Sequence, residues 1–465
     1  MKSEIQLLSY DEQWKEKVRS FSIEGGVMPE GSVTVKTTPL QGRFSGRRIE
    51  AEFQASGTEE RVSLALAFAF QEWRTEDYLL VPAAVYDANR FRVKKVPYAP
   101  MFHREDYGKE VPVTITDIPH FSVGAGESAI SLRAGDSSVP AVFLYFREQN
   151  RGAAFLYPCH AENGMENGCV ILEKREEKAS VLTLRIMAPA VRSRGMYRFG
   201  DIRSDVPCED RPASLRAGES LAIQADCYEF PCCSLAEFYE TVFALCHTEV
   251  PVAGKRSLPD GVPFSHAFHL VEDKYNRYSW YPKYGFYCVG ENEGLYSCWQ
   301  TGWVGGINAA WPLYADGSEL TRERALSTMD FMFRHMQAPT GFFYGVSDGE
   351  HQYGDDFADI CYRGVSLVRK SADALYFSAC ILLEMRKRNI FPDSLWVRGL
   401  RNCADAFCAL FQREGQLGQF LDVDTGEILV GCSASGGMAP AGLALCALYF
   451  GEDRYLQKAE EISAY

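Results

Sequence analysis

The sequence predicts a multidomain protein of β and α structure, with an N-terminal antiparallel β-sandwich and a C-terminal ring of paired α-helices. Up to about residue 230 the apolar residues alternate with a period of two, and beyond it they follow helical periods. The chain has 465 residues, more than one hydrophobic core usually organises, so at least two domains are expected.

The β-sandwich prediction covers residues 1–230. Short runs rich in Val, Ile, Phe and Tyr recur there, for example 61–70, 140–148 and 219–230, and Gly, Pro, Asp and Ser separate them. Alternating apolar and polar residues with turn signals between the runs are typical of antiparallel strands in a sandwich.

Residues 231–290 are predicted to connect the two parts. Ser234 suits the N-cap of a helix whose apolar residues share one face. A stretch with Pro and Gly, 251–263, indicates a linker, and the aromatic segment 275–287 follows it.

Residues 291–465 are predicted to form three helical hairpins. Three segments are apolar on every side and must be buried, whereas three others are amphipathic and cover them. The inner helices are expected at 301–314, 372–385 and 437–450, and the outer helices at 319–337, 394–414 and 453–465. Such alternation is what a ring of hairpins around a central cup requires.

The predicted ring is incomplete. Six hairpins would close it, and three already fill the chain from residue 297 to Tyr465. Because the last helix reaches Tyr465 without a Gly, Asn or Pro stop signal, the sequence predicts that the ring continues beyond this residue. The alternative is a smaller bundle that the last helix completes.

Composition and charge exclude several functions. With 62 acidic and 48 basic residues the net charge is −14, which opposes binding to DNA, RNA or anionic membranes. The N-terminus lacks a secretory signal, and no segment approaches the roughly 18 apolar residues of a membrane helix. We expect a cytoplasmic protein without nucleic-acid or membrane partners, and the oligomeric state stays open. The 15 cysteines, irregularly spaced, indicate buried free thiols.

Two segments resemble a known family. The strand-to-helix segment 218–242 and the hairpin start 434–451 resemble the bacterial six-hairpin glycosidases, and the glucuronidase-like branch is the nearest. The resemblance implies a β-sandwich, a linker helix and an (α/α)₆ toroid, together with hydrolysis of O-glycosyl bonds. It spans the whole chain, but no segment matches a catalytic signature and the family's later hairpins are absent.

Acidic loops supply the candidate catalytic residues. Cleavage of a glycosidic bond needs two carboxyl groups, about 5 Å apart for retention and about 6.5–9.5 Å apart for inversion. The densest acidic loop, 348–364, contains the candidates Asp355 and Asp356, with a solvated loop or a helix cap as the alternative. A second pair, Glu291 and Glu293, precedes the first expected inner helix.

Aromatic and amide side chains near the predicted cup are candidate sugar contacts, because flat apolar rings stack on sugar rings. The alternative is that they pack the core or a domain junction. The candidates are Trp280 and Tyr281 in the aromatic segment, Trp299, Gln300 and Trp303 at the expected start of the first inner helix, and Tyr344 in loop 341–345.

Three cations before the second inner helix are candidate contacts for a uronic acid. Arg363, Arg369 and Lys370 lie there, and a guanidinium donates two parallel hydrogen bonds to a carboxylate. The alternative is that these cations pair with nearby aspartates. Asp373, close to the same helix start, is interpreted as stabilising the helix dipole.

No cofactor or metal is expected. The sequence has no phosphate-binding loop, dinucleotide fingerprint or nucleophile elbow, and its His and Cys residues lack the paired spacing of a zinc site. The leading hypothesis is therefore a cofactor-independent glycoside hydrolase for a small oligosaccharide or uronide. A sugar epimerase or polysaccharide lyase, and a non-catalytic carbohydrate-binding protein, remain alternatives.

Overall fold

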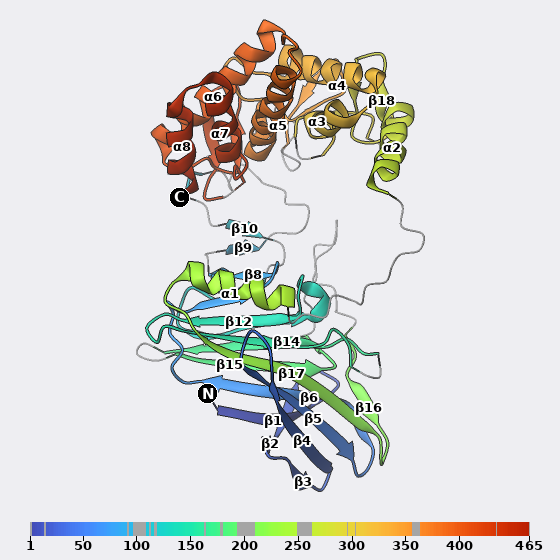
Figure 1. The fold of residues 1–465 in the computed structure, drawn as a ribbon, viewed down its shortest axis with the longest axis vertical. Coiled ribbons are helices and arrows are strands. Elements are labelled where there is room, and N and C mark those ends of the chain that lie inside the picture. Colours follow the sequence, from blue (N-terminus) through green and yellow to red (C-terminus); the bar gives the residue numbers. More distant parts are fainter. Residues whose placement is uncertain are drawn as a thin grey trace. The chain divides into compact units, whose positions relative to one another are not determined.

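The computed structural model describes most of the chain and combines sheets with helices, as the sequence predicts. The described residues are 2–13, 15–90, 93–95, 108–110, 113–115, 119–161, 164–176, 180–192, 210–248, 263–294, 296–302, 304–355, 363–433 and 435–464. The chain divides into two compact units (Figure 1). The β unit comprises 1–99 and 114–256, and the helical unit comprises 100–113 and 257–465.

The first sheet of the β unit has seven strands in the order β11-β14-β15-β6-β1-β2, with β16 also on β6. Its neighbouring strands pair in the antiparallel direction. The strands are β1 Lys2–Tyr10, β2 Glu16–Ser22, β6 Glu59–Phe70, β11 Gly126–Arg133, β14 Gly168–Arg175, β15 Ser180–Ala188 and β16 Ala213–Leu215.

The second sheet has eight strands in the order β3-β4-β5-β17-β13-β12-β7-β8, again antiparallel. They are β3 Gly26–Met28, β4 Gly31–Leu40, β5 Gly46–Ala55, β7 Tyr78–Val81, β8 Val85–Tyr86, β12 Ala141–Phe146, β13 Arg151–Leu156 and β17 Ser220–Pro231. Two further strands, β9 Val93–Lys95 and β10 Val113–Ile115, form a small sheet, and 3₁₀ turns cover Asp87–Asn89 and Ala134–Asp136.

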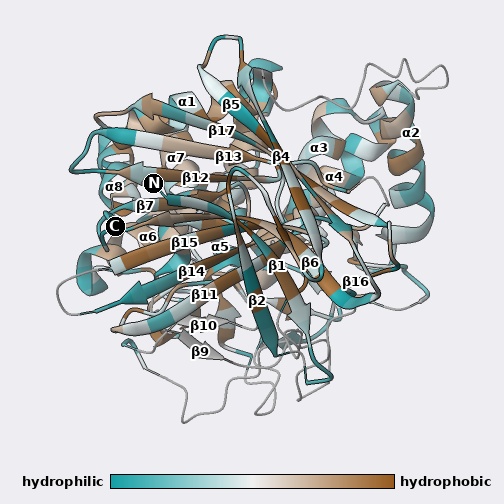
Figure 2. Ribbon diagram, turned by 90° about the horizontal axis from the view of Figure 1, so that it is seen from below, coloured by the Kyte–Doolittle hydropathy of each residue, from teal (hydrophilic) through white to brown (hydrophobic). Residues whose placement is uncertain are grey.

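One apolar core joins the two large sheets, which confirms the predicted sandwich. Apolar and polar residues occur along many of the same strands (Figure 2), and alternate residues of strands such as β5 are buried. Phe68 of the first sheet meets Phe155 of the second with ring centroids 4.7 Å apart, and both are buried.

Helix α1, Leu235–Thr248, packs on the eight-stranded sheet. The ring of Phe238 stacks on Tyr145 with centroids 5.7 Å apart. Ser234 is the N-cap, as predicted, because its hydroxyl accepts a hydrogen bond from the Glu237 amide at 3.2 Å.

Removal of this cap should destabilise the β unit. Ser234→Ala leaves the Glu237 amide without its side-chain acceptor, so the free energy of unfolding should fall by about 1 kcal/mol. Urea unfolding followed by circular dichroism measures it. Ser234→Thr, which keeps the hydroxyl, should behave almost as the wild type; an equal loss in both variants would contradict the capping role.

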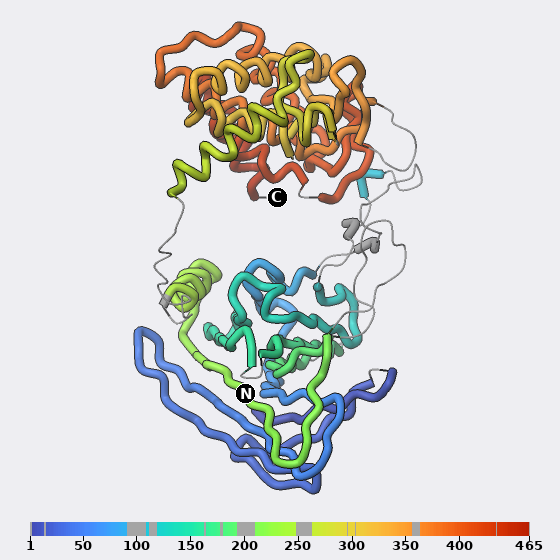
Figure 3. The backbone as a smooth tube through the Cα atoms, turned by 90° about the vertical axis from the view of Figure 1, so that its right-hand side faces the viewer, coloured from blue at the N-terminus to red at the C-terminus, as the bar shows by residue number. Residues whose placement is uncertain are grey.

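In the described part of the helical unit, α3 packs against α4, α5 against α6 and α7 against α8. Helix α5 packs against both α3 and α7, so these inner helices form a row, and α4, α6 and α8 are their outer partners (Figure 3). The helices are α2 Phe264–Lys274, α3 Gly306–Asp316, α4 Glu319–Phe331, α5 Val368–Lys387, α6 Ser394–Glu414, α7 Ala439–Phe450 and α8 Asp453–Ser463, with π-helical turns at Tyr275–Ser279 and Met332–Met336. A closed six-hairpin ring stays a prediction.

Two inner helices begin elsewhere than the sequence pattern indicates. Helix α3 starts at Gly306 and not at residue 301, because the preceding Gly302 and Gly305 have φ values of +68° and +72°, which no α-helix accommodates. Helix α5 starts earlier than expected, at Val368, so Arg369 and Lys370 lie in its first turn.

Glu272 ties α2 to the start of α4. Its carboxylate accepts hydrogen bonds from the Ser318 amide and the Thr321 hydroxyl, each at 2.6 Å. Burial alone would raise the pKa of Glu272, but these hydrogen bonds outweigh it and lower the pKa to about 2.

The stability that Glu272 contributes should therefore depend on pH. A folded-state pKa below the ordinary 4.5 means that the contribution, at most about 3 kcal/mol, is complete above pH 4.5 and is lost as the pH falls toward 2. Urea unfolding from pH 7 to 2.5 should show the difference between wild type and Glu272→Gln shrinking below pH 4.5. The exposed control Glu323→Gln should show no such change, and a pH-independent difference for Glu272→Gln would contradict the assignment.

Every cysteine in the described ranges is a free thiol, although Cys159 and Cys233 are exposed and not buried as expected. No helix in this part of the chain is long and apolar enough to cross a membrane.

Candidate active site at the inner-helix N-termini

Two small antiparallel sheets join the loops that precede the three inner helices. The sheet β20-β21-β22 links the loop before α3 to the loop before α5, and β23-β24-β25 links the latter to the loop before α7. The strands are β20 Trp299–Gln300, β21 Val346–Ser347, β22 Gln352–Tyr353, β23 Val365–Leu367, β24 Phe420–Asp422 and β25 Glu427–Val430; a separate pair is β18 Trp280–Tyr281 with β19 Phe286–Tyr287. Polar residues of different hairpins are thus brought together.

Tyr344, Arg363 and Asp424 form one such group, called the triad below. The Tyr344 hydroxyl donates to Oδ1 of Asp424, and Nε of Arg363 lies 3.7 Å from the other carboxylate oxygen. The guanidinium carbon of Arg363 lies 5.4 Å from the centroid of the Tyr344 ring. The side chain of Asp424 is 25% exposed and that of Arg363 is 56% exposed, so the triad is accessible to a solute.

A tight turn presents Asp424 to the other two residues. The side chain of Asp422 accepts hydrogen bonds from the amides of Asp424, at 2.9 Å, and Thr425, at 3.4 Å. Gly426 ends the turn with a φ of +73°, which glycine adopts without strain. Asp424 is not among the residues predicted from the sequence, although 422-DVDTG carries these turn signals.

Asp355 forms a buried ion pair with Lys370. Nζ of Lys370 lies 2.5 Å from Oδ1 of Asp355, and the Leu367 amide donates to Oδ2 at 2.9 Å. Both side chains are at most 5% exposed, and the lysine also donates to the Gly345 carbonyl. With both oxygens engaged, Asp355 is placed to fix the start of α5, and Lys370 is turned inward and not toward a uronate.

Asp373 joins two inner helices. Its carboxylate accepts from Nδ2 of Asn308 of α3 at 3.3 Å and lies 3.7 Å from Nε of Arg369. The side chain of Arg369 is about half exposed, whereas that of Asp373 is buried. Arg363, Arg369 and Lys370 thus each lie beside an aspartate. This is the alternative interpretation given above for the three cations.

Buried amide oxygens lie on the same side of the unit. Oδ1 of Asn308 and Oε1 of Gln300 are buried and have no hydrogen-bond partner among the described residues. Gln300 belongs to β20, and Asn308 lies in the first turn of α3. An acceptor of this kind matches the hydroxyl groups of a polyol.

Three of the predicted aromatic contacts, Trp280, Tyr281 and Trp299, pack against other side chains of the unit. Trp299 is fully buried, its indole N–H donates to the Thr301 hydroxyl at 2.7 Å, and its ring meets Phe331. Trp280 lies under the Arg324 guanidinium at 4.9 Å, and Tyr281 meets Phe286 edge-on. Because Trp299 and Gln300 form a strand, they do not begin the first inner helix.

The remaining predicted residues are not joined to the triad. Glu291 and Glu293 are exposed. Their carboxylates make no hydrogen bond or ion pair to the described residues of the triad. Asp356 and Trp303 lie outside the described residues. Within the described ranges no group of three or more His, Cys, Asp or Glu side chains could hold a metal ion.

Comparison with known proteins gives distant likenesses only. No family model matches the sequence, and no curated protein matches it. A solved bacterial glucoamylase complexed with acarbose is 12% identical, with 99% of this chain and 60% of that chain covered and a TM-score of 0.24. The Slr1438 protein from Synechocystis is 12% identical (49% and 62% covered, TM-score 0.25), and a provisionally named aldose 1-epimerase from Klebsiella pneumoniae is 7% identical (52% and 56% covered, TM-score 0.26).

The chain thus spans about three fifths of the length of these structures. All three TM-scores lie below 0.5, so none of these likenesses assigns an activity to the chain.

Proposed function

We propose that the helical unit binds a carbohydrate at the triad and is a glycoside hydrolase for a small oligosaccharide or uronide. The triad is the observation that carries the proposal. It combines an accessible carboxylate, a tyrosine hydroxyl and a guanidinium, drawn from the loops before α5 and α7. These groups suit the hydroxyls of a sugar, and Arg363 suits a uronate.

Asp424 is the proposed ionised carboxylate of the reaction. A hydroxyl donor and a guanidinium face its two oxygens. Such a group serves as general base or nucleophile, whereas the proton donor must be a second carboxyl group. Asp356, in the loop that leads to Arg363, is the sequence-based candidate for the second role, and buried Asp355 is better placed to hold that loop.

A panel of p-nitrophenyl glycosides and glucuronides tests the proposal. The full chain should release p-nitrophenol from at least one substrate, and the rate should fall when Asp424 is changed. Sugar binding measured by calorimetry without any release would instead support a non-catalytic carbohydrate-binding protein. The engagement of Asp355 by Lys370, which removes one candidate acid, favours this second function.

A further inference from the structure

Strand β17 has a neighbour on only one side over half of its length. Strand β5 pairs with it from Ser220 to Tyr228, but β13 pairs only with its second half, Asp226–Pro231. No other strand in the described part of the β unit pairs with β17 at residues 220–225. This stretch is a sheet edge inside an eight-stranded sheet.

The hydrogen-bonding groups of this edge point toward the empty side. The carbonyl of Glu219 accepts a hydrogen bond from the Ala55 amide, on the β5 side, at 3.0 Å. The amide of Cys232 donates a hydrogen bond on the β13 side at 2.9 Å. Since successive residues of an antiparallel strand bond to alternate sides, the amides and carbonyls of Ala222 and Gln224 face away from β5. No described residue makes a backbone hydrogen bond to them there.

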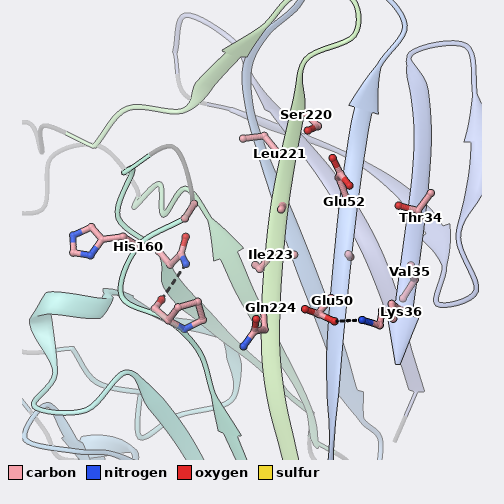
Figure 4. A pocket seen from close by; sticks show the side chains of 15 residues that line it. Thr34, Val35, Lys36, Glu50, Glu52, His160, Ser220, Leu221, Ile223 and Gln224 are labelled. Carbon is pink, nitrogen blue, oxygen red and sulfur yellow. Dashed lines mark hydrogen bonds and ion pairs between the residues drawn. The ribbon is translucent and has the colours of Figure 1, made fainter. Parts of the chain in front are cut away.

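A hollow of about 710 Å³ lies along the edge (Figure 4). The hollow extends from the polar face of β4 and β5 across residues 220–224 of β17 to Pro158, His160, Ala161 and Asn167 beyond the edge.

The loop opposite β17 is a built wall. His160 and Glu166 form an antiparallel bridge, the Asn167 amide donates to the Cys159 carbonyl at 2.8 Å, and the Asn167 side chain donates to the Pro158 carbonyl at 3.0 Å. The residues opposite β17 are therefore held in place by their own hydrogen bonds.

The edge lacks the devices that usually prevent strand addition. Exposed edges commonly carry Lys, Pro or a bulge. Residues 220–225 are Ser-Leu-Ala-Ile-Gln-Ala, and their register with β5 is continuous.

Charge and side-chain size define the occupant. Glu52 lies opposite Ala222 and Glu50 opposite Gln224 on the polar face. Glu50 is paired with Lys36 at 3.6 Å, whereas Glu52 is exposed and makes no ion pair with a described residue. A long basic side chain can cross the small Ala222 to reach Glu52. On the other face Leu221 and Ile223 are buried in the core, which leaves space for small apolar side chains.

We propose that the β17 edge at Ser220–Gln224 is a docking site for an extended peptide of a partner protein. The peptide adds as a strand between β17 and loop 158–167, along the line of β13. A basic side chain of the peptide faces Glu52, and small apolar side chains alternate with the basic ones. Its backbone pairs with Ala222 and Gln224, the mode of recognition known as β-augmentation.

A labelled synthetic peptide tests this proposal. The probe is fluorescein-Lys-Ala-Lys-Val-Lys-Ala, titrated with the full chain and followed by fluorescence polarisation. Two control peptides carry either N-methyl groups on alternate backbone amides or Glu in place of Lys. The probe should bind, and each control should bind at least about tenfold more weakly. Absence of binding, or equal binding of the N-methylated peptide, overturns the proposal.

Protein variants locate the binding to this edge. Ala222→Pro removes an outward amide that makes no bond to β5, so it should weaken binding about tenfold while the melting temperature stays near that of the wild type. Ala222→Ser keeps the amide and should bind normally. Glu52→Lys reverses the charge of this side chain and should also weaken binding, so it tests the site even if the proline variant does not fold. Equal affinity of wild type and Glu52→Lys, or a wild-type dimer that Ala222→Pro dissociates, contradicts a partner peptide at this site.

Discussion

Replacement of Asp424 by asparagine is expected to lower kcat/KM on the best p-nitrophenyl substrate by about 10²–10⁴-fold, the range for loss of a catalytic base. Asparagine has the same size and still accepts a hydrogen bond from Tyr344, so the triad should keep its shape. What is lost is the negative charge beside Arg363. A binding defect would raise KM, whereas loss of a proton-transfer or nucleophilic group lowers kcat.

The control for this variant lies in the same β-hairpin. Glu427 is an exposed carboxylate on β25, and Glu427→Gln should leave kcat/KM within about twofold of the wild type. Tyr344→Phe should give a smaller loss than Asp424→Asn, because it removes a hydrogen-bond donor and leaves the carboxylate in place. Unchanged kcat in Asp424→Asn would rule out this residue as the base or nucleophile.

Replacement of Lys370 by methionine is expected to give the largest loss of stability, about 3–5 kcal/mol. The substitution leaves the Asp355 carboxylate buried, with a hydrogen bond from the Leu367 backbone amide but without its counter-ion. A buried charge without its counter-ion is costly because it has lost hydration and receives no compensation. Urea unfolding of the full chain, followed by near-ultraviolet circular dichroism, measures the change.

An exposed ion pair of similar length provides the comparison. Lys283 and Glu350 lie 2.7 Å apart, but both side chains are more than half exposed. Lys283→Met should therefore cost much less stability than Lys370→Met, because solvent screens an exposed pair. The double variant Asp355→Asn/Lys370→Met should recover part of the loss of Lys370→Met, since no charge is then buried. Equal losses for Lys283→Met and Lys370→Met would contradict the role of burial.

Much of the fold could be predicted because it depends on local periodicity. Alternating residues in runs such as 61–70 expose one face of a strand to the core, and helices such as α6 and α8 have one apolar side. These patterns act over a few residues, so they can be read without knowing which segments are neighbours. Ser234 at the start of α1 is predictable for the same reason.

The site could be predicted only in part, because its contacts join distant residues. Tyr344 and Asp424 are 80 residues apart, and the tertiary structure brings their two loops together. The loop 341–345 and Arg363 had been selected from the sequence, but the partner Asp424 had not. Asp355, chosen as a catalytic acid, was acidic and correctly placed in a loop, yet its burial against Lys370 is invisible in the sequence.

The sequence by itself thus determined the types and order of the elements: a β-sandwich, a capped helix and three hairpins of buried and amphipathic helices. The tertiary structure decided which polar residues meet, which aromatic rings are buried and where β17 is left without a neighbour. The physical reason is that periodicity and capping are local, whereas strand pairing and burial depend on contacts between segments far apart in the chain.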